Sequence, residues 1–189
     1  DWTSCMNRYI QARVKKRDLS SLRGYILKKD SPSCGMERVK LFNEKGMAER
    51  KAVGLYARAL HDQYPLLPVE EEGRLNDAGL RENFIVRVFA YDRLRNLFEG
   101  RFKRGDVVRF HANHKYLILA HSPKHYTELG RLVAAIAKYS PSEFRDIYCK
   151  TFMESLQVKT TVKKNVNVLQ HIMGFLKEKL TADEKADIN

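Results

Sequence analysis

A proline-stiffened turn, Asp30-Ser31-Pro32-Ser33-Cys34-Gly35, follows directly on a strand-like run at residues 22–28. Proline fixes its own φ and pushes the preceding residue toward an extended backbone, which excludes a helix here. Gly35 lacks the Cβ that would hinder a bulky partner approaching the sulfur of Cys34. Such a turn suits a reactive or metal-ligating thiol, although the local residues alone more often mean a turn with an incidental cysteine.

The elements around this turn predict an α/β domain. A helix is expected over residues 3–17, a strand over 38–43 that ends at Gly46, and a helix over 48–60. Residues 64–69 contain two prolines and read as extended. A strand, helix, strand order fits a three-layer α/β arrangement, in which ligands bind at the carboxyl ends of strands, where Cys34 lies.

From Asp77 onward the pattern is helical throughout, which predicts an all-α region. Two helix starts carry Ser-Pro signals, at Ser122-Pro123 and in the capping box Ser140-Pro141-Ser142-Glu143, and Thr181 opens a further capping box. The expected helices cover residues 77–98, 104–120, 123–138, 141–156 and 163–180. We expect the helix at 141–156 to bury Phe144, Ile147, Tyr148, Phe152 and Leu156, and the helix at 163–180 to bury Val168, Leu169, Ile172, Phe175 and Leu176. Close helix packing is expected at Gly174.

The charge of the chain favours a polyanionic partner. The net charge is +12 for 189 residues, with 14 Lys/Arg against 6 Asp/Glu in residues 1–60 and 15 against 6 in residues 101–180. The intervening residues 61–100 are acidic on balance, with 5 Lys/Arg against 8 Asp/Glu. Two basic regions suggest two surfaces that face nucleic acid. Neither a membrane-spanning run nor a signal peptide is visible, and three scattered cysteines favour a reducing cytoplasm over a disulfide framework.

Two blocks of motifs carry a family resemblance. The first resembles the C-terminal half of the thiouracil-desulfurase (TudS) family, and the second resembles the bacterial YbgA-type domain. The first block comprises Ser31 to Met36, Arg38-Val39-Lys40, Leu67 to Leu75 and Arg81 to Phe84; the second comprises His114-Lys115-Tyr116, Ala120 to Tyr126, Leu129 to Ala134 and Asn167 to Phe175.

In this order the two blocks are similar to the bacterial tRNA 4-thiouridine desulfidases of the RudS type. The resemblance places an incomplete TudS-like domain at residues 1–98 and a YbgA-type, putatively RNA-binding all-α domain, incomplete at its C-terminus, at residues 99–189. A desulfurase domain of this type has roughly a further half-domain upstream. The chain, which begins at Asp1, is therefore expected to be a fragment that is inactive alone.

The resemblance also implies the chemistry. Cys34 would be one of three thiolates that hold a [4Fe–4S] cluster, whose open iron binds the sulfur of a thiocarbonyl while water attacks the ring carbon. Uridine and sulfide are the products. Ser31 and Ser33 are the candidate catalytic residues, with Ser31 preferred for contact with substrate or water. Each could instead simply cap the turn. Cys5 and Cys149 are expected to be structural.

The glutamates, histidines and basic residues outside the turn have other interpretations. The run Glu70-Glu71-Glu72 is expected to be a solvated loop, or else Glu71 or Glu72 would orient Arg74 or Arg81. The histidines make a weak metal site, since Pro123 interrupts the spacing of His121 and His125. Cationic and aromatic residues near the Ser122-Pro123 helix start suggest an RNA clamp. The RNA-binding candidates are Arg101, Lys103, Arg104, His114, Lys115, His121, Lys124, His125, Arg131, Lys163, Lys164, Asn167 and His171.

Three functions thus stay open. The leading one is sulfur removal from 4-thiouridine in tRNA, with the helical domain holding the tRNA. The second is a desulfurase of free thiolated nucleobases or nucleosides, which would not need so large a positive charge. The third is a non-catalytic nucleic-acid-binding module, since this chain carries one expected cluster ligand and not three.

Overall fold

A computed structural model describes residues 3–16, 19, 21–42, 46–176 and 180–184. The chain divides into two compact units, Asp1–Asn96 and Leu97–Asn189, which are described separately. This division falls two residues before the domain boundary expected from the sequence. No helix in the described part of the chain is both long and apolar enough to cross a bilayer.

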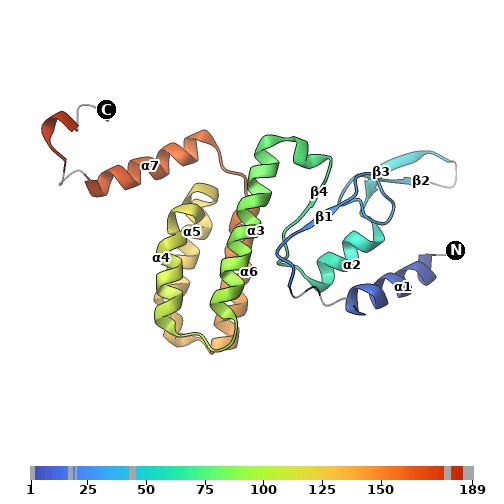
Figure 1. Ribbon diagram of the computed structural model, residues 1–189, viewed down its shortest axis with the longest axis horizontal. Helices are drawn as coiled ribbons and strands as arrows, with labels where there is room; N and C mark the ends of the chain where they lie inside the picture. The colour runs from blue at the N-terminus through green and yellow to red at the C-terminus, as the bar shows by residue number, and fades with distance from the viewer. Residues whose placement is uncertain (1–2, 17–18, 20, 43–45, 177–179, 185–189) are drawn as a thin grey trace. The chain divides into compact units, whose positions relative to one another are not determined.

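The first unit contains helices and two small sheets (Figure 1). Its elements are α1 (Thr3–Lys16), β1 (Tyr25–Leu27), β2 (Val39–Phe42), β3 (Ala48–Ala52), α2 (Leu55–Gln63), β4 (Val69–Glu71), a 3₁₀ turn η1 (Arg74–Asn76) and most of α3 (Ala78–Phe98). Strands β1 and β4 pair in parallel, with Tyr25 opposite Val69 and Leu27 opposite Glu71. The segments that follow these two strands therefore leave from the same edge of the sheet.

The second sheet is an antiparallel hairpin of β2 and β3. The helix expected over residues 48–60 is therefore wrong in its first half, because Ala48–Ala52 pair with β2 and the helix begins only at Leu55. Ala-Glu-Arg-Lys-Ala has a good helix propensity, but pairing with a neighbouring strand overrides it. Gly46 takes φ +74, a left-handed conformation that glycine adopts readily at a turn.

The core of the first unit forms around α1, α2 and the parallel strand pair. Helix α1 packs on α2 through a narrow apolar stripe. Ile10 and Val14 are buried on α1, whereas Met6 and Tyr9 are 44% and 59% exposed. On α2 the fully buried residue is Leu60.

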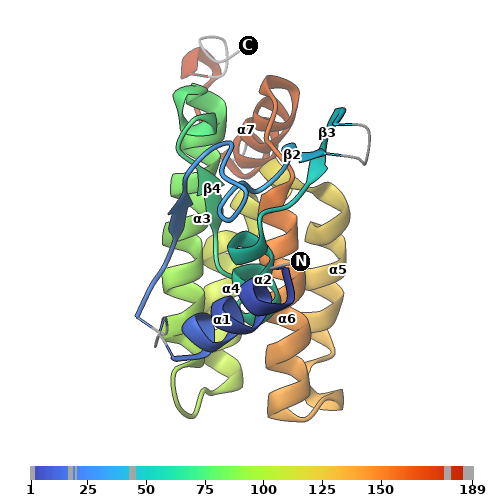
Figure 2. The same ribbon diagram turned by 90° about the vertical axis from the view of Figure 1, so that its right-hand side faces the viewer.

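The second unit is a set of packed helices. Its elements are α4 (Arg104–His121), α5 (Pro123–Ala134), a 3₁₀ turn η2 (Ile136–Lys138), α6 (Pro141–Gln157) and α7 (Val162–Leu176). Figures 1 and 2 show α4, α5 and α6 side by side, and α7 contacts α4. The two Ser-Pro starts are confirmed, since Ser122 and Ser140 each accept the N–H three residues on, while the helix expected to reach Lys138 ends at Ala134.

An aromatic stack forms the centre of this unit. The rings of Phe144 and Tyr148 stack with centroids 5.5 Å apart, and those of Tyr148 and Phe152 with centroids 6.1 Å apart. These residues are four positions apart on α6, so they share one helix face. Phe110 of α4 closes the stack at 5.4 Å from Phe152. The expected inward face of α6 is confirmed except at Ile147, which is 38% exposed.

Helix α7 departs from its expected packing. Of the five residues expected to be buried, only Val168 is; Leu169, Ile172, Phe175 and Leu176 are exposed. A Cβ added at Gly174 would meet no atom of the described residues within 4 Å, so the expectation of close packing there was also wrong. Helical periodicity predicted the apolar face correctly but could not predict what covers it. The α/β portion followed by an all-α region is confirmed.

Candidate functional site

The turn that carries Cys34 lies between two residues in the left-handed region, Asp30 at φ 55 and Arg38 at φ 62. Within it, the Gly35 N–H donates to the Ser31 carbonyl at 2.8 Å. The Ser31 hydroxyl oxygen accepts the N–H groups of Ser33 and Cys34 at 3.3 and 3.2 Å. Ser31 therefore acts as the internal cap of the turn, as one of its two interpretations predicted.

The thiol of Cys34 is half-buried and has hydroxyl neighbours. The Ser33 Oγ lies 3.5 Å from the Cys34 Sγ and 3.0 Å from the Ser31 Oγ. The two expected catalytic hydroxyls are thus in contact with each other, and Ser33 is the one in contact with the sulfur. The site has an accessible sulfur next to a short chain of hydroxyl groups.

Helix α2 fixes the turn from behind. Its first N–H groups donate to turn carbonyls: Leu55 N–H to Pro32 O at 3.3 Å, and Tyr56 and Ala57 N–H to Ser33 O at 2.8 and 3.2 Å. The free N–H groups that every helix start leaves are satisfied in this way by the cysteine turn.

Two glycines make this close approach possible. A Cβ on Gly54 would lie 2.4 Å from the Ser33 carbonyl oxygen and 2.8 Å from the Cys34 nitrogen. A Cβ on Gly35 would lie 2.4 Å from the Val39 side chain and 3.0 Å from the Ser31 carbonyl oxygen. Gly35 is therefore needed for packing inside the turn, and its expected role in clearing a path to the sulfur stays a prediction.

Glu70 and Glu71 lie in β4 and not in a solvated loop, which corrects the expectation for these two, whereas Glu72 is exposed as expected. Glu70 and Glu71 are each only 4% exposed. Glu71 accepts the N–H of Met36 at 2.6 Å, and Glu70 accepts from Arg74 Nε at 2.6 Å, so the Arg74 partner is Glu70 and not Glu71 or Glu72. Since β1 and β4 are parallel, their carboxyl ends meet, which brings Glu71 beside the turn.

A charged cleft of about 250 Å³ lies beside the turn. Its lining includes Lys29, Arg38, Arg50 and Arg74, interleaved with acidic side chains such as Glu37 and Glu71. Arg74 also pairs with Glu37. Basic groups thus gather at the edge of the cysteine turn.

The described residues do not by themselves fit an iron–sulfur cluster. Cys5 is exposed on α1, and Cys149 belongs to the second unit, where burial raises the pKa of its thiol to about 12. No group of three His, Cys, Asp or Glu residues that could hold a metal occurs within the described ranges. Cys34 is half-buried and is one thiol where a cluster of this kind needs three.

The RNA-binding candidates divide by exposure. His114 and His121 are buried, and their Nδ1 atoms bond the carbonyls of Phe110 and Val158 at 2.8 and 2.7 Å. The Lys164 Nζ donates to the His121 carbonyl at 2.7 Å. These three side chains have structural partners. The exposed candidates are Arg101, Lys103, Arg104, Lys124, Arg131, Lys163, Asn167 and His171.

The two remaining candidates are half-buried. Lys115 lies over the rings of Tyr116 and Phe175, with its Nζ 5.0 and 5.7 Å from their centroids. The His125 Nδ1 lies 2.7 Å from the Ser122 Oγ. Both side chains are engaged within the helical unit and offer RNA only part of their surface.

Comparisons with known proteins match both parts of the chain. Residues 1–72 match the family model described as 2-thiouracil desulfurase, and residues 115–189 match the model described as Protein of unknown function (DUF1722). The Uncharacterized protein YbgA of Escherichia coli (strain K12) is 26% identical over 108 residues, which cover 57% of this chain and 64% of that relative, just under two thirds of its length. No solved structure matches. The expected resemblance is thus confirmed: a region that matches the 2-thiouracil desulfurase model precedes a region that is similar to YbgA.

Proposed function

We propose that this chain is part of an enzyme that removes sulfur from 4-thiouridine in tRNA. The first unit would act on the thiolated base, and the helical second unit would bind the tRNA. In the net reaction water replaces sulfur at the pyrimidine carbon, so that C=S becomes C=O and sulfide leaves. No electron is transferred in this exchange.

The observation that carries the proposal is the geometry of Cys34 within the region that matches the desulfurase family. Cys34 is half-buried and lies at the carboxyl edge of a parallel strand pair, where α/β proteins bind ligands. The turn is held by α2 on one side and by Glu71 on the other. A sulfur held so firmly is suited to contact a substrate atom in a fixed direction.

The chain's own residues have distinct roles in this proposal. Ser31 shapes the turn, and Ser33 presents its hydroxyl beside the sulfur, 3.5 Å away, where it can donate a hydrogen bond to a bound substrate or water. Cys34 supplies one thiolate toward the [4Fe–4S] cluster that the desulfurase resemblance implies. When bound, that cluster supplies a Lewis-acidic iron for the thiocarbonyl sulfur.

RNA binding by the second unit is supported by its exposed basic side chains. Lys124 lies in the first turn of α5 and Lys163 in the first turn of α7. Lysines at these places add positive charge to helix starts, which already favour phosphate. A free thiolated base would have no use for these charges.

The test is sulfide release from 4-thiouridine-containing tRNA by the intact protein under anaerobic conditions. We expect Cys34→Ser to abolish release and bound iron, while Cys149→Ser, a matched change far from the turn in sequence, retains both. Lys124→Ala combined with Lys163→Ala should weaken tRNA binding and leave turnover of free 4-thiouridine unchanged. Equal turnover by Cys34→Ser and the parent protein would refute the proposal.

A second function, non-catalytic RNA binding, is favoured by one observation. The described residues place one thiol at the turn and no second one beside it. Under this alternative the intact protein binds tRNA but releases no sulfide and contains no iron. Faster turnover of free thiolated bases than of tRNA would instead identify a desulfurase of small substrates.

A further inference from the structure

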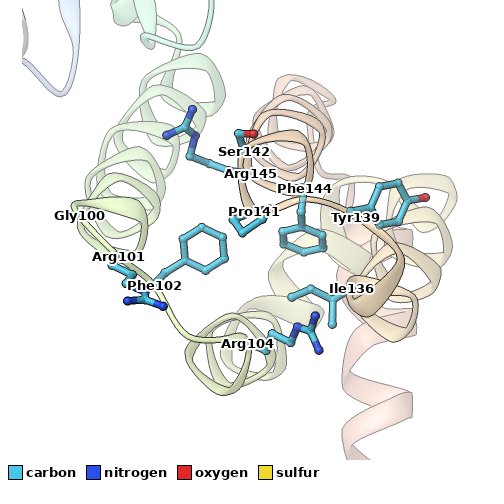
Figure 3. A pocket seen from close by; sticks show the side chains of 10 residues that line it. All are labelled: Gly100, Arg101, Phe102, Arg104, Ile136, Tyr139, Pro141, Ser142, Phe144 and Arg145. Carbon is cyan, nitrogen blue, oxygen red and sulfur yellow. The ribbon is translucent and has the colours of Figure 1, made fainter.

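A cavity of about 460 Å³ lies wholly within the helical unit (Figure 3). It is formed by the segment Gly100–Arg104 before and at the start of α4, and by residues 136–145 from η2 to the first turns of α6. Its volume falls in the range of roughly 300–1,000 Å³ typical of small-ligand pockets. Nothing in the desulfurase chemistry uses it.

Three arginines lie around this cavity, Arg101, Arg104 and Arg145, and no carboxylate lines it. Arg101 and Arg104 are exposed, and neither forms an ion pair with any residue in the described ranges. Arg145 pairs through its Nε with Asp146 at 3.1 Å, an exposed contact of little strength. Guanidinium groups bind phosphate oxygens in a bidentate manner, so this rim suits a phosphate group.

The floor of the cavity is aromatic and apolar. Figure 3 shows the rings of Phe102 and Phe144 toward its middle, with Tyr139 at one side. Phe102 is half-buried and packs edge-on against Phe98, with centroids 4.7 Å apart, so its ring is held in place. Phe144 is buried. A flat base can stack on the half-buried rings of Phe102 and Tyr139, whereas Phe144 is too buried to offer a free face.

We propose that this cavity, named here the arginine pocket (Arg101, Phe102, Arg104, Tyr139, Phe144 and Arg145), binds one unpaired nucleotide of an RNA strand. The base lies between Phe102 and Tyr139, and the adjoining phosphates contact the arginines. The proposal rests on the RNA-binding role of the helical unit given above. It goes further because it assigns a discrete pocket for one unstacked nucleotide. A diffuse basic surface would have no such pocket.

The first measurement is fluorescence anisotropy of a labelled single-stranded uridine hexamer with the whole chain. We expect Arg104→Ala to weaken binding roughly tenfold or more, since a charged hydrogen bond contributes about 1.5–3 kcal/mol and about 1.4 kcal/mol is tenfold. The matched control is Arg109→Ala, an exposed arginine on the same helix outside the pocket, expected to change binding less than about threefold. Thermal melts confirm that both variants are folded.

The second measurement is photo-crosslinking of the same hexamer carrying one 4-thiouridine, mapped by peptide mass spectrometry. Crosslinks at Phe102 or Tyr139 that Arg104→Ala removes would support the pocket. Equal weakening by Arg104→Ala and Arg109→Ala, with crosslinks elsewhere, would overturn it while leaving tRNA desulfuration standing. Displacement of the hexamer by an equal concentration of uridine monophosphate would also overturn it, in favour of a free nucleotide. Arg104-dependent hexamer binding without sulfide release from tRNA would uphold the pocket and refute the desulfurase.

Discussion

At the level of single residues, Gly54 decides how the cysteine turn meets α2. Its backbone, φ −62 and ψ 144, is one that alanine adopts without strain, so the effect of a substitution there is purely steric. The added Cβ would meet backbone atoms of Ser33 and Cys34, which cannot rotate away as a side chain can. We expect Gly54→Ala to lower the free energy of unfolding by about 1–3 kcal/mol and to change the alkylation rate of Cys34.

The control for this prediction is Gly130→Ala. An added Cβ there meets nothing within 4 Å, and Gly130 lies inside α5. Alanine is the better helix former by about 0.5–1 kcal/mol, so this variant should be slightly more stable and leave Cys34 reactivity unchanged. Urea titration and the rate of thiol alkylation measure both effects. Identical behaviour of the two variants would show that the turn does not depend on Gly54.

At the level of helices and strands, the start of α7 stabilises the end of α4. The Lys164 ammonium donates to the carbonyls of His121 and Lys159 at 2.7 and 3.2 Å. The last carbonyls of a helix have no partner within the helix. A cation at this end also interacts favourably with the negative pole of the helix dipole. We expect Lys164→Ala to reduce stability by about 1–2 kcal/mol in urea titration.

Lys163→Ala is the natural comparison for Lys164→Ala. Lys163 precedes Lys164 in the same helix but is exposed, so its removal should change stability by about 0.5 kcal/mol or less. For RNA affinity we expect the opposite pattern. Lys163→Ala should weaken RNA binding and Lys164→Ala should not, because Lys163 is available to phosphate and Lys164 is not. A larger stability loss at Lys163 than at Lys164 would contradict the assignment.

The histidines of α4 should make the helical unit sensitive to acid. Burial lowers the pKa of His121 and of His111, and neighbouring lysines, Lys164 and Lys115, lower them further. The unfolded chain therefore takes up these protons near pH 6.5, before the folded chain does. Stability is full above about pH 7 and falls as the pH drops below about 6.5.

This pH dependence is checked by urea titrations at about pH 7.5 and 5.5, following the helical circular dichroism. His121→Gln keeps an amide donor for the Val158 carbonyl and removes the titrating group, so its stability should vary less between the two pH values. A parent protein equally stable at both pH values would contradict the prediction.

The sequence was most informative where local chemistry decides the structure. The serines before Pro123 and Pro141 predicted two helix starts correctly, since a cap depends on neighbours within three residues. Sequence-based prediction failed at Ala48–Ala52 and on the outer face of α7, because the structure there depends on contacts with other elements. At the site, the turn at Cys34 was predictable from its proline, whereas the contacts of Gly54 and Glu71 were not, because they join segments 20 and 35 residues away.

At the level of the whole molecule, charge is the property that connects the two units without any assumption about how they are placed. Basic residues exceed acidic ones in residues 1–60 and again in residues 101–180, and the total is +12. In the first unit basic groups line the cleft beside the cysteine turn, and in the second they surround the arginine pocket. An RNA that engages both units would contact many lysines and arginines at once.

Such binding must depend steeply on salt. Each phosphate contact releases condensed counterions, so 6 to 10 contacts would cost roughly 10³–10⁵ in affinity between about 50 and 200 mM salt. We expect tRNA binding by the whole chain, measured by filter binding across that range, to fall linearly on a log–log plot. Lys124→Ala with Lys163→Ala should reduce the slope by about two contacts, whereas Gly130→Ala should leave it unchanged. A flat salt response would mean that phosphate contacts do not hold the RNA, and the basic surfaces would then need another partner.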